Sequence, residues 1–156
     1  YEIRLSLVGS EMCIRDSPMP VITAIHGVAY GGGTQIALGG DIRIAAPDIK
    51  MSVLEIKWGL IPDMSLTQTL RDLVSLDVAK ELTFTGRVLN GEQAKEIGLV
   101  THVDENPLER AFALAKEIAA KSPDFVITGP DVARYPTFNS FAIICAIVVL
   151  PKPGGP

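Results

Sequence analysis

The sequence predicts an α/β protein, because short runs rich in β-branched residues alternate along the chain with segments of helical periodicity. A buried strand is expected over residues 20–25, where a proline precedes a run containing Val, Ile and Thr. Three consecutive glycines, Gly31 to Gly33, then lead into good helix formers up to Leu38, which predicts a helix. Apolar–polar alternation over residues 42–45 predicts a second strand.

The remaining elements are each placed by an apolar pattern together with a residue that starts or ends a helix. They are a helix over residues 66–76, a helix over 78–84 that Asp77 caps, a helix from Asn90 to Ile97 that Gly98 ends, a strand over 99–103, and a helix over 108–121 with Pro107 in its first turn. Strands and helices therefore follow one another as they do in α/β domains.

Length and composition indicate one globular domain, since the chain has 156 residues, of which 47% are hydrophobic and 21% are charged. The net charge is −4 and the lysines and arginines are scattered, so no nucleic-acid partner is expected. The longest apolar run, residues 141–150, is about half of a membrane-spanning helix, so no membrane partner is expected. Cys13 and Cys145 both lie outside the central block, which argues against disulfides and favours a cytoplasmic location.

The chain divides into three segments of different character. Residues 7–17, LVGSEMCIRDS, read as an in-frame translation of a sequencing-library adapter, so residues 1–17 are expected to be an artefact; a natural amphipathic N-terminus is the alternative. Residues 18–124 are the expected domain. Residues 125–156 hold only 3 charged residues and are rich in Pro and Gly, which is poor material for a packed element and also fits a shifted reading frame.

The glycine run is the first feature suited to chemistry. Glycine lets the chain turn sharply and lets a backbone N–H approach a ligand without a Cβ in the way, and a helix N-terminus adds positive partial charge. Gly31 to Gly33, between a strand and a helix, therefore suit an anion or an oxyanion. The stretch matches neither G-x-G-x-x-G nor a phosphate-binding loop, so a purely structural turn is the other interpretation.

A carboxylate among apolar residues is the second feature. Glu55 stands between Leu54 and Ile56, and Trp58 and Ile61 follow. A carboxylate that faces inward there is desolvated, which suits a group that exchanges protons near neutral pH. The alternative places Glu55 on the solvent side of a half-buried element, which is ordinary for a glutamate.

Several motifs stand in a fixed order along the chain. They are Gly27, the three glycines at 31–33, Asp41-Ile42-Arg43, Glu55-x-x-x-Gly59-x-x-Pro62, and the segments at 82–87 and 94–100. This set resembles the enoyl-CoA hydratase/isomerase (crotonase) family over about residues 18–124, and it is far more specific than any single motif. The resemblance implies a crotonase-like fold, the spiral of β-β-α units of the ClpP/crotonase class, present here as a truncated fragment, and an acyl-CoA thioester as substrate.

The resemblance also implies roles for individual residues. Gly32 matches the family's second oxyanion-hole donor, whose backbone N–H meets the thioester oxygen, and removal of such a donor costs about 10²–10³ in rate. Glu55 matches one of the two catalytic glutamates of hydratases, a role worth about 10²–10⁴. Trp58 and Phe84 fit either the core or the wall of the acyl pocket. The residues expected to line the substrate site are Gly31, Gly33, Gln35, Trp58, Ile61 and Pro62.

Two acid positions of the family need separate treatment. Gln35 stands where hydratases have their other glutamate, and an amide cannot take or give a proton at neutral pH. Double-bond isomerisation by Glu55 alone survives this loss better than two-carboxylate water addition does. Asp63 falls where dienoyl-CoA isomerases of the family carry a further acid, so it is a candidate catalytic residue; a turn or a helix cap is the other interpretation.

We therefore expect the parent protein to be an enoyl-CoA hydratase or isomerase that uses no cofactor beyond the CoA of its substrate, and the resemblance implies a homo-oligomer, a trimer or hexamer. No metal site is expected, because His102 has no second His or Cys near it. The family's first oxyanion donor precedes the first strand and is missing if the adapter interpretation holds, so the chain itself is expected to be inactive. Two alternatives remain: a catalytically weakened protein that binds acyl-CoA or a partner, motivated by Gln35, and a nucleotide-binding α/β module.

Overall fold

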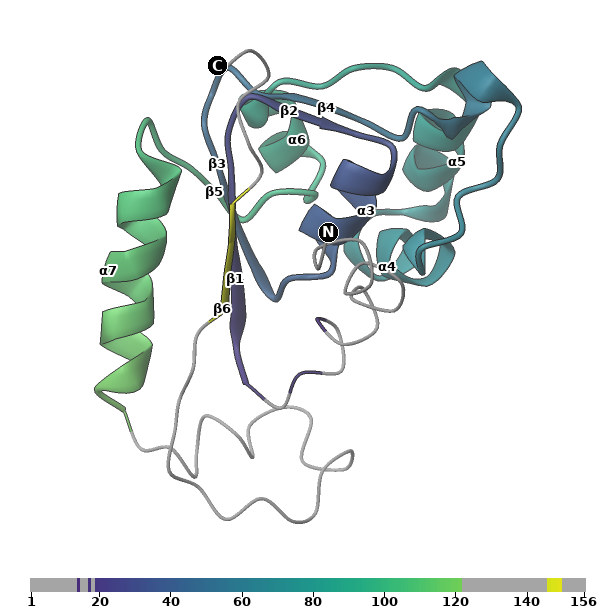
Figure 1. Ribbon diagram of the computed structural model, residues 1–156. Coiled ribbons are helices and arrows are strands. Elements are labelled where there is room, and N and C mark those ends of the chain that lie inside the picture. The colour runs from purple at the N-terminus through teal and green to yellow at the C-terminus, as the bar shows by residue number, and fades with distance from the viewer. Residues whose placement is uncertain (1–13, 15–16, 18, 122–145, 150–156) are drawn as a thin grey trace, which may run out of the picture.

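A four-stranded parallel sheet runs through the middle of the molecule (Figure 1). The structure, a computed structural model, describes residues 14, 17, 19–121 and 146–149. The strand order is β5-β3-β1-β6, formed by His102–Val103, Ile42–Ala45, Val21–Ile25 and Ala146–Val149. Strand β1 is paired on both sides, with Ile22 opposite Ile42 of β3 and Ile147 of β6.

A second, two-stranded parallel sheet joins β2 (Val28–Tyr30) to β4 (Lys50–Ser52). The helices are α3 (Gly32–Leu38), α4 (Leu66–Leu73), α5 (Leu76–Thr85), α6 (Gly91–Glu96) and α7 (Pro107–Ala119), with a 3-10 helix η1 (Glu55–Trp58). Along the chain, β1-β2-α3 is followed by β3-β4 and then, after η1, by α4, so pairs of strands alternate with helices as β-β-α units. The predicted α/β fold is confirmed.

Helices cover both faces of the four-stranded sheet. Helix α7 lies on one side, and α3, α4 and α6 lie on the other (Figure 1). Because side chains alternate along a strand, β1 contributes to both layers. Ile22 and Ala24 pack in one cluster with Ala111 of α7, whereas Ile25 packs in the larger cluster with Leu38 of α3. A parallel strand covered on both faces is expected to be apolar almost throughout, and this one is.

The helices predicted over 66–76 and 78–84 have different boundaries, and a break between them explains the difference. Helix α4 ends at Leu73 because Val74 is extended, and Ser75 then serves as the N-cap residue of α5. The predicted cap at Asp77 is therefore wrong. Asp77 lies in the first turn of α5, where hydrogen bonds from the Ser75 side chain and from backbone N–H groups lower the pKa of its carboxyl group.

The helix predicted from Asn90 is confirmed as α6, but the strand expected after it is shorter than predicted. Asn90 and Gln93 form a capping box at the start of α6. After the helix, the N–H groups of Leu99 and Val100 both point to the Ala94 carbonyl, at 2.8 and 3.2 Å, and close a turn. Only the last two residues of the predicted strand pair with β3.

Four short elements, β2, β4, η1 and β6, were not predicted. Each has three or four residues, which is too few for a periodic pattern to be recognised. Strand β6 lies within residues 125–156, whose composition predicts no packed element, and it is defined by its pairing with β1. The rest of that tail and most of the predicted adapter segment, 1–17, lie outside the described residues. Every helix within the described part falls short of the length and hydropathy needed to cross a bilayer.

A buried arginine ties β3 to the turns beside it. The Arg43 side chain is 7% exposed; its Nε donates to the Leu99 carbonyl at 2.7 Å and its Nη1 donates to the Gly40 carbonyl at 2.6 Å. Burial lowers the pKa of this guanidinium, and the neighbouring Asp41 carboxylate opposes that effect. Because an arginine stays charged at any working pH, these two carbonyl oxygens compensate part of its desolvation.

We expect Arg43→Met to lower the free energy of unfolding by about 2–4 kcal/mol, because two buried carbonyl oxygens lose their donor. Urea denaturation followed by circular dichroism measures this change. The matched control is Arg71→Met on the exposed side of α4, which should stay within about 0.5 kcal/mol of the original protein. Equal effects of the two substitutions would show that the Arg43 hydrogen bonds do not stabilise the fold.

Candidate active site

The glycine run forms a sharp bend between β2 and α3. Gly31 has φ 52° and ψ −118°, a backbone conformation that side chains rarely allow. Its N–H donates to the Ser52 carbonyl at 3.0 Å, which ties the bend to the end of β4. The predicted turn and helix start are therefore confirmed, and the bend is anchored to a strand far away in the sequence.

Gly32 and Gly33 open helix α3 and have different surroundings. The first N–H groups of a helix have no carbonyl acceptor within the helix, so the Gly32 N–H is directed beyond the helix end. A Cβ added to Gly32 would lie 3.3 Å from the Met64 Sδ, whereas one added to Gly33 would meet nothing within 4 Å. Gly32 thus lies against the segment before α4, and Gly33 faces open space.

Glu55, the first residue of η1, brings a carboxylate to this bend. Its side chain is 8% exposed, and its Oε1 lies 3.2 Å from the position that a Cβ on Gly31 would occupy. The missing side chain of Gly31 therefore makes room for the carboxylate. Gly59 adopts φ 65° and ends η1, with its N–H bonded to the Ile56 carbonyl at 3.2 Å. Of the two sequence-based alternatives for Glu55, the structure has the inward-facing one.

Gln35 of α3 joins Glu55 to the segment before α4. Its Nε2 donates to the Glu55 Oε1 at 2.6 Å, and its own Oε1 accepts the Met64 N–H at 2.9 Å. The other carboxylate oxygen of Glu55, Oε2, is buried and has no hydrogen-bond partner among the described residues. Buried polar atoms are normally paired, so an unpaired carboxylate oxygen here points to a functional group.

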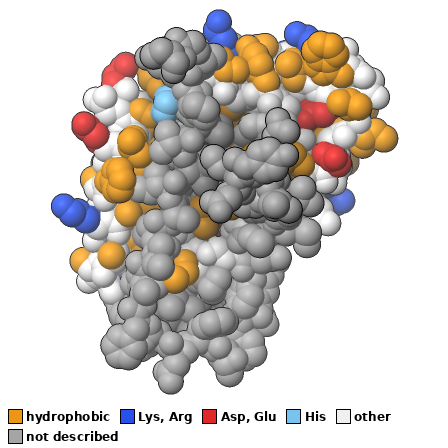
Figure 2. Space-filling view, viewed as in Figure 1, with side chains coloured by type: hydrophobic (Ala, Val, Ile, Leu, Met, Phe, Trp, Pro, Cys, Tyr) orange, Lys and Arg blue, Asp and Glu red, His pale blue; other side chains and the backbone are white. Residues whose placement is uncertain are grey.

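A pocket of about 190 Å³ opens beside Glu55. The residues that line it are Tyr30, Gly31, Leu54, Glu55, Trp58 and Leu60. One carboxylate among aromatic and aliphatic side chains suits an apolar ligand that carries a reacting polar group. Hydrophobic side chains gather on the part of the surface in Figure 2 that corresponds to α5 and its neighbours in Figure 1.

The pocket brings several predicted site residues together. Gly31, Glu55 and Trp58 line it, and Gln35 is bonded to Glu55. The core interpretation of Trp58 and Phe84 is wrong, because these side chains are 76% and 69% exposed. Trp58 forms part of the exposed rim of the pocket instead.

The predicted site residues Gly32, Gly33 and Gln35 of α3 lie outside the lining of this pocket, and three more lie outside it further along the chain. Ile61 and Asp63 are exposed and Pro62 is half-buried, all on the segment between η1 and α4. The Asp63 carbonyl accepts the Ser65 N–H at 2.9 Å and closes a turn, while Ser65 itself is the N-cap residue of α4. Of the structural interpretations of Asp63, the turn therefore holds and the helix cap does not.

Sequence reasoning missed other residues of the site. Tyr30, Leu54 and Leu60 line the pocket, and only their position beside the glycine run or beside Glu55 could have indicated them. Met64 contributes its backbone N–H, and because nearly every residue type has one, the sequence could not have indicated it.

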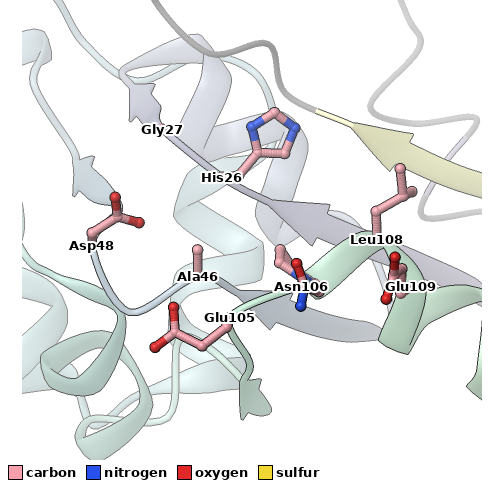
Figure 3. A pocket seen from close by; sticks show the side chains of 9 residues that line it. His26, Gly27, Ala46, Asp48, Glu105, Asn106, Leu108 and Glu109 are labelled. Carbon is pink, nitrogen blue, oxygen red and sulfur yellow. The ribbon is translucent and has the colours of Figure 1, made fainter.

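A larger pocket of about 550 Å³ lies at the carboxyl end of β1 and the N-terminus of α7 (Figure 3). Asp48, Glu105, Glu109 and His26 belong to its lining, and Figure 3 shows Asp48 and Glu109 on opposite sides of it. Nowhere in the described part of the chain do three His, Cys, Asp or Glu side chains form a group that could hold a metal ion. Three carboxylates disfavour an anionic ligand, so this pocket is the weaker candidate.

Comparisons with known proteins identify the family that the chain resembles. A family model described as enoyl-CoA hydratase/isomerase matches residues 4–130. The chain is 46% identical over 118 residues to enoyl-CoA hydratase domain-containing protein 2, mitochondrial, of Mus musculus. The aligned region covers 72% of this chain and 40% of that protein. It is 42% identical over 116 residues to methylglutaconyl-CoA hydratase, mitochondrial, of Mus musculus. Here the aligned region covers 70% of this chain and 37% of that protein.

A solved structure extends the similarity to the fold. The crystal structure of an enoyl-CoA hydratase from Mycobacterium tuberculosis H37Rv superposes with a TM-score of 0.71 at 35% identity and covers 74% of this chain and 47% of that chain. The present chain thus spans less than half the length of these relatives.

Gly31→Ala is expected to destabilise the protein by about 1–3 kcal/mol, because an L side chain is strained in this backbone conformation and the Cβ crowds the Glu55 carboxylate. Gly33→Ala is the matched control; it lies in a helix with open space around it and should leave stability unchanged or raise it by up to about 1 kcal/mol. Thermal unfolding of both variants tests this. A Gly31→Ala protein as stable as Gly33→Ala would contradict the geometry of the bend.

Proposed function

Because the chain belongs to the enoyl-CoA hydratase/isomerase family, we propose that the complete protein containing it moves a proton on an enoyl-CoA thioester. The observation that carries this proposal is the buried Glu55 carboxylate beside the glycine bend. The relatives include a methylglutaconyl-CoA hydratase and an enoyl-CoA hydratase, whose names support the substrate class. Coenzyme A takes part only as a portion of the substrate.

In the proposed reaction, the thioester carbonyl lies at the N-terminus of α3 and Glu55 takes a proton from the carbon beside it. The electron pair of that C–H bond forms a carbon–carbon double bond, and negative charge moves onto the thioester oxygen. The Gly32 N–H stabilises this oxygen, and the partial positive charge of the helix end adds to the effect. Gly31 and Gly33 shape the bend, and Tyr30 and Trp58 contact the apolar part of the acyl chain.

We favour double-bond isomerisation over hydration. Returning the proton to a carbon further along the same acyl chain restores the thioester carbonyl, moves the double bond, and requires one carboxyl group and no water. Water addition is served better by two groups that transfer protons, and the Gln35 amide cannot be one of them. The exposure of Asp63, outside the pocket lining, supports leaving it without a catalytic role.

Binding without turnover is the second candidate function, and the amide at Gln35 favours it. The complete protein would then bind acyl-CoA, or a partner protein, at the same pocket and consume neither 2-enoyl- nor 3-enoyl-CoA. A nucleotide-binding module has less support, because the glycine run matches no phosphate-binding motif. Tight binding of NAD or ATP without competition from CoA would revive it.

We also propose that the complete protein is a homo-oligomer, a trimer or hexamer, since exposed apolar side chains such as Phe84 and Ile61 are often covered in assemblies. Its compartment stays a prediction. A cytoplasmic location fits the cysteine pattern, whereas the two mouse relatives carry the word mitochondrial in their names. In the proposed reaction, the small-molecule partner is the acyl-CoA thioester.

Glu55→Gln in the complete protein is expected to lower turnover of 3-enoyl-CoA by about 10²–10⁴, because the amide keeps the shape of the side chain and cannot carry a proton. Binding of the thioester should persist, since the rest of the pocket is unchanged. Steady-state kinetics and calorimetric titration measure the two quantities. Full turnover by Glu55→Gln would remove Glu55 from the mechanism.

Asp63→Asn is the matched control for this experiment. It also replaces a carboxylate by an amide, but on the exposed segment outside the pocket lining, so turnover should change less than about twofold. A loss as large as that of Glu55→Gln would instead make Asp63 a second catalytic acid.

A further inference from the structure

Gln35 is bonded directly to the proposed base, Glu55, but its amide has no role in proton transfer. Its side chain is 3% exposed and bonds to Glu55, which is the one buried carboxylate among the described residues, yet it cannot transfer a proton. We propose that Gln35 is a positioning residue whose amide holds Glu55 by Oε1 and leaves Oε2 as the oxygen that exchanges protons with substrate. This inference rests on the proposed function and gives Gln35 a specific role within it.

The direction of the Gln35 amide follows from its two partners. A backbone N–H only donates, so the atom that faces the Met64 N–H at 2.9 Å must be the amide oxygen. The amide nitrogen then faces Glu55 and donates to Oε1 at 2.6 Å. This bond is strengthened because its acceptor is an ionised carboxylate. Gln35 is thus held at both ends of its amide and can hold Glu55 in turn.

Helix η1 contributes little to the orientation of Glu55. It has four residues, of which only Glu55 is buried, and Ile56 and Trp58 are 48% and 76% exposed. A carboxylate on so short and exposed an element would otherwise rotate and exchange its two oxygens. The bond from α3 restricts this rotation, while Oε2, which has no partner among the described residues, keeps its lone pairs for a proton.

The same amide also links the base to the oxyanion donor. Met64, whose N–H binds Gln35, places its sulfur 3.3 Å from the position that a Cβ on Gly32 would occupy. One side chain therefore connects Glu55 with the segment that lies against Gly32. Proton transfer by Glu55 and charge stabilisation by Gly32 need these two groups at fixed relative positions, and a misplacement of about 1 Å can lower the rate by about 10².

Gln35→Met tests the role, because it keeps the length and volume of the side chain and removes both hydrogen bonds. The complete protein is assayed with 3-enoyl-CoA deuterated at C2, and the measured quantities are kcat, KM and the fraction of deuterium delivered to C4 of the product. We expect kcat to fall about 10²-fold with KM changed less than about twofold, and the delivered deuterium to fall because a swinging carboxylic acid exchanges with solvent.

Two further variants separate positioning from stability. Gln35→Asn keeps an amide that is one methylene too short to reach both partners, so kcat should fall about tenfold even if Gln35→Met does not fold. Thr34→Val is the matched control. It removes a buried hydroxyl of the same helix that, among the described residues, donates to the Ala29 and Ser52 carbonyls, so it should lower the melting temperature and leave kcat and deuterium delivery unchanged.

The possible outcomes have distinct meanings. Unchanged kcat and deuterium delivery in the folded Gln35 variants would overturn the positioning role while the proposed function stands. Equal losses in Thr34→Val would also overturn it, because the effect would then come from reduced stability. Absence of turnover in the original protein would overturn the proposed function first, and this inference with it.

Discussion

The hydrogen bond between Gln35 and Glu55 is the interaction on which the site depends, and the pairing of two short strands makes it possible. Strands β2 and β4 run parallel with Tyr30 opposite Ser52, so their carboxyl ends lie side by side. The glycine bend follows one strand and Glu55 follows the other, three residues after the end of β4. Each of two successive β-β-α units therefore supplies one half of the site.

The burial of Glu55 explains why this arrangement suits proton transfer. A carboxylate with one oxygen held by an amide and the other unpaired is costly in a folded protein unless something compensates it. Close to it lies a helix end whose first N–H groups lack acceptors within the helix. In the reaction that we propose, a thioester loses a proton to the carboxylate and gains negative charge at the helix end, which would satisfy both features.

The sequence was sufficient for the elements with strong local patterns and for part of the candidate site. Strand β1 and helix α3 follow from their apolar runs and flanking glycines, and of the residues that the family resemblance selected, the structure places Glu55 beside Gly31. The parallel pairing of β2 with β4 is a long-range contact between three-residue strands, so no local pattern predicts it. For the same reason the lining by Tyr30, the exposure of Trp58 and the bond from the Met64 backbone emerge only in three dimensions.

Loss of a proton from C2 of 3-enoyl-CoA tests the role of Glu55 most directly, because it is the first chemical step of the proposed isomerisation. The complete protein is mixed with 3-enoyl-CoA, and the C2 methylene proton signal of the substrate is followed by proton NMR. We expect this signal to disappear with the original protein and to persist with Glu55→Gln. Loss of this signal at the same rate in both proteins, or in neither, would contradict the assignment of Glu55 as the base.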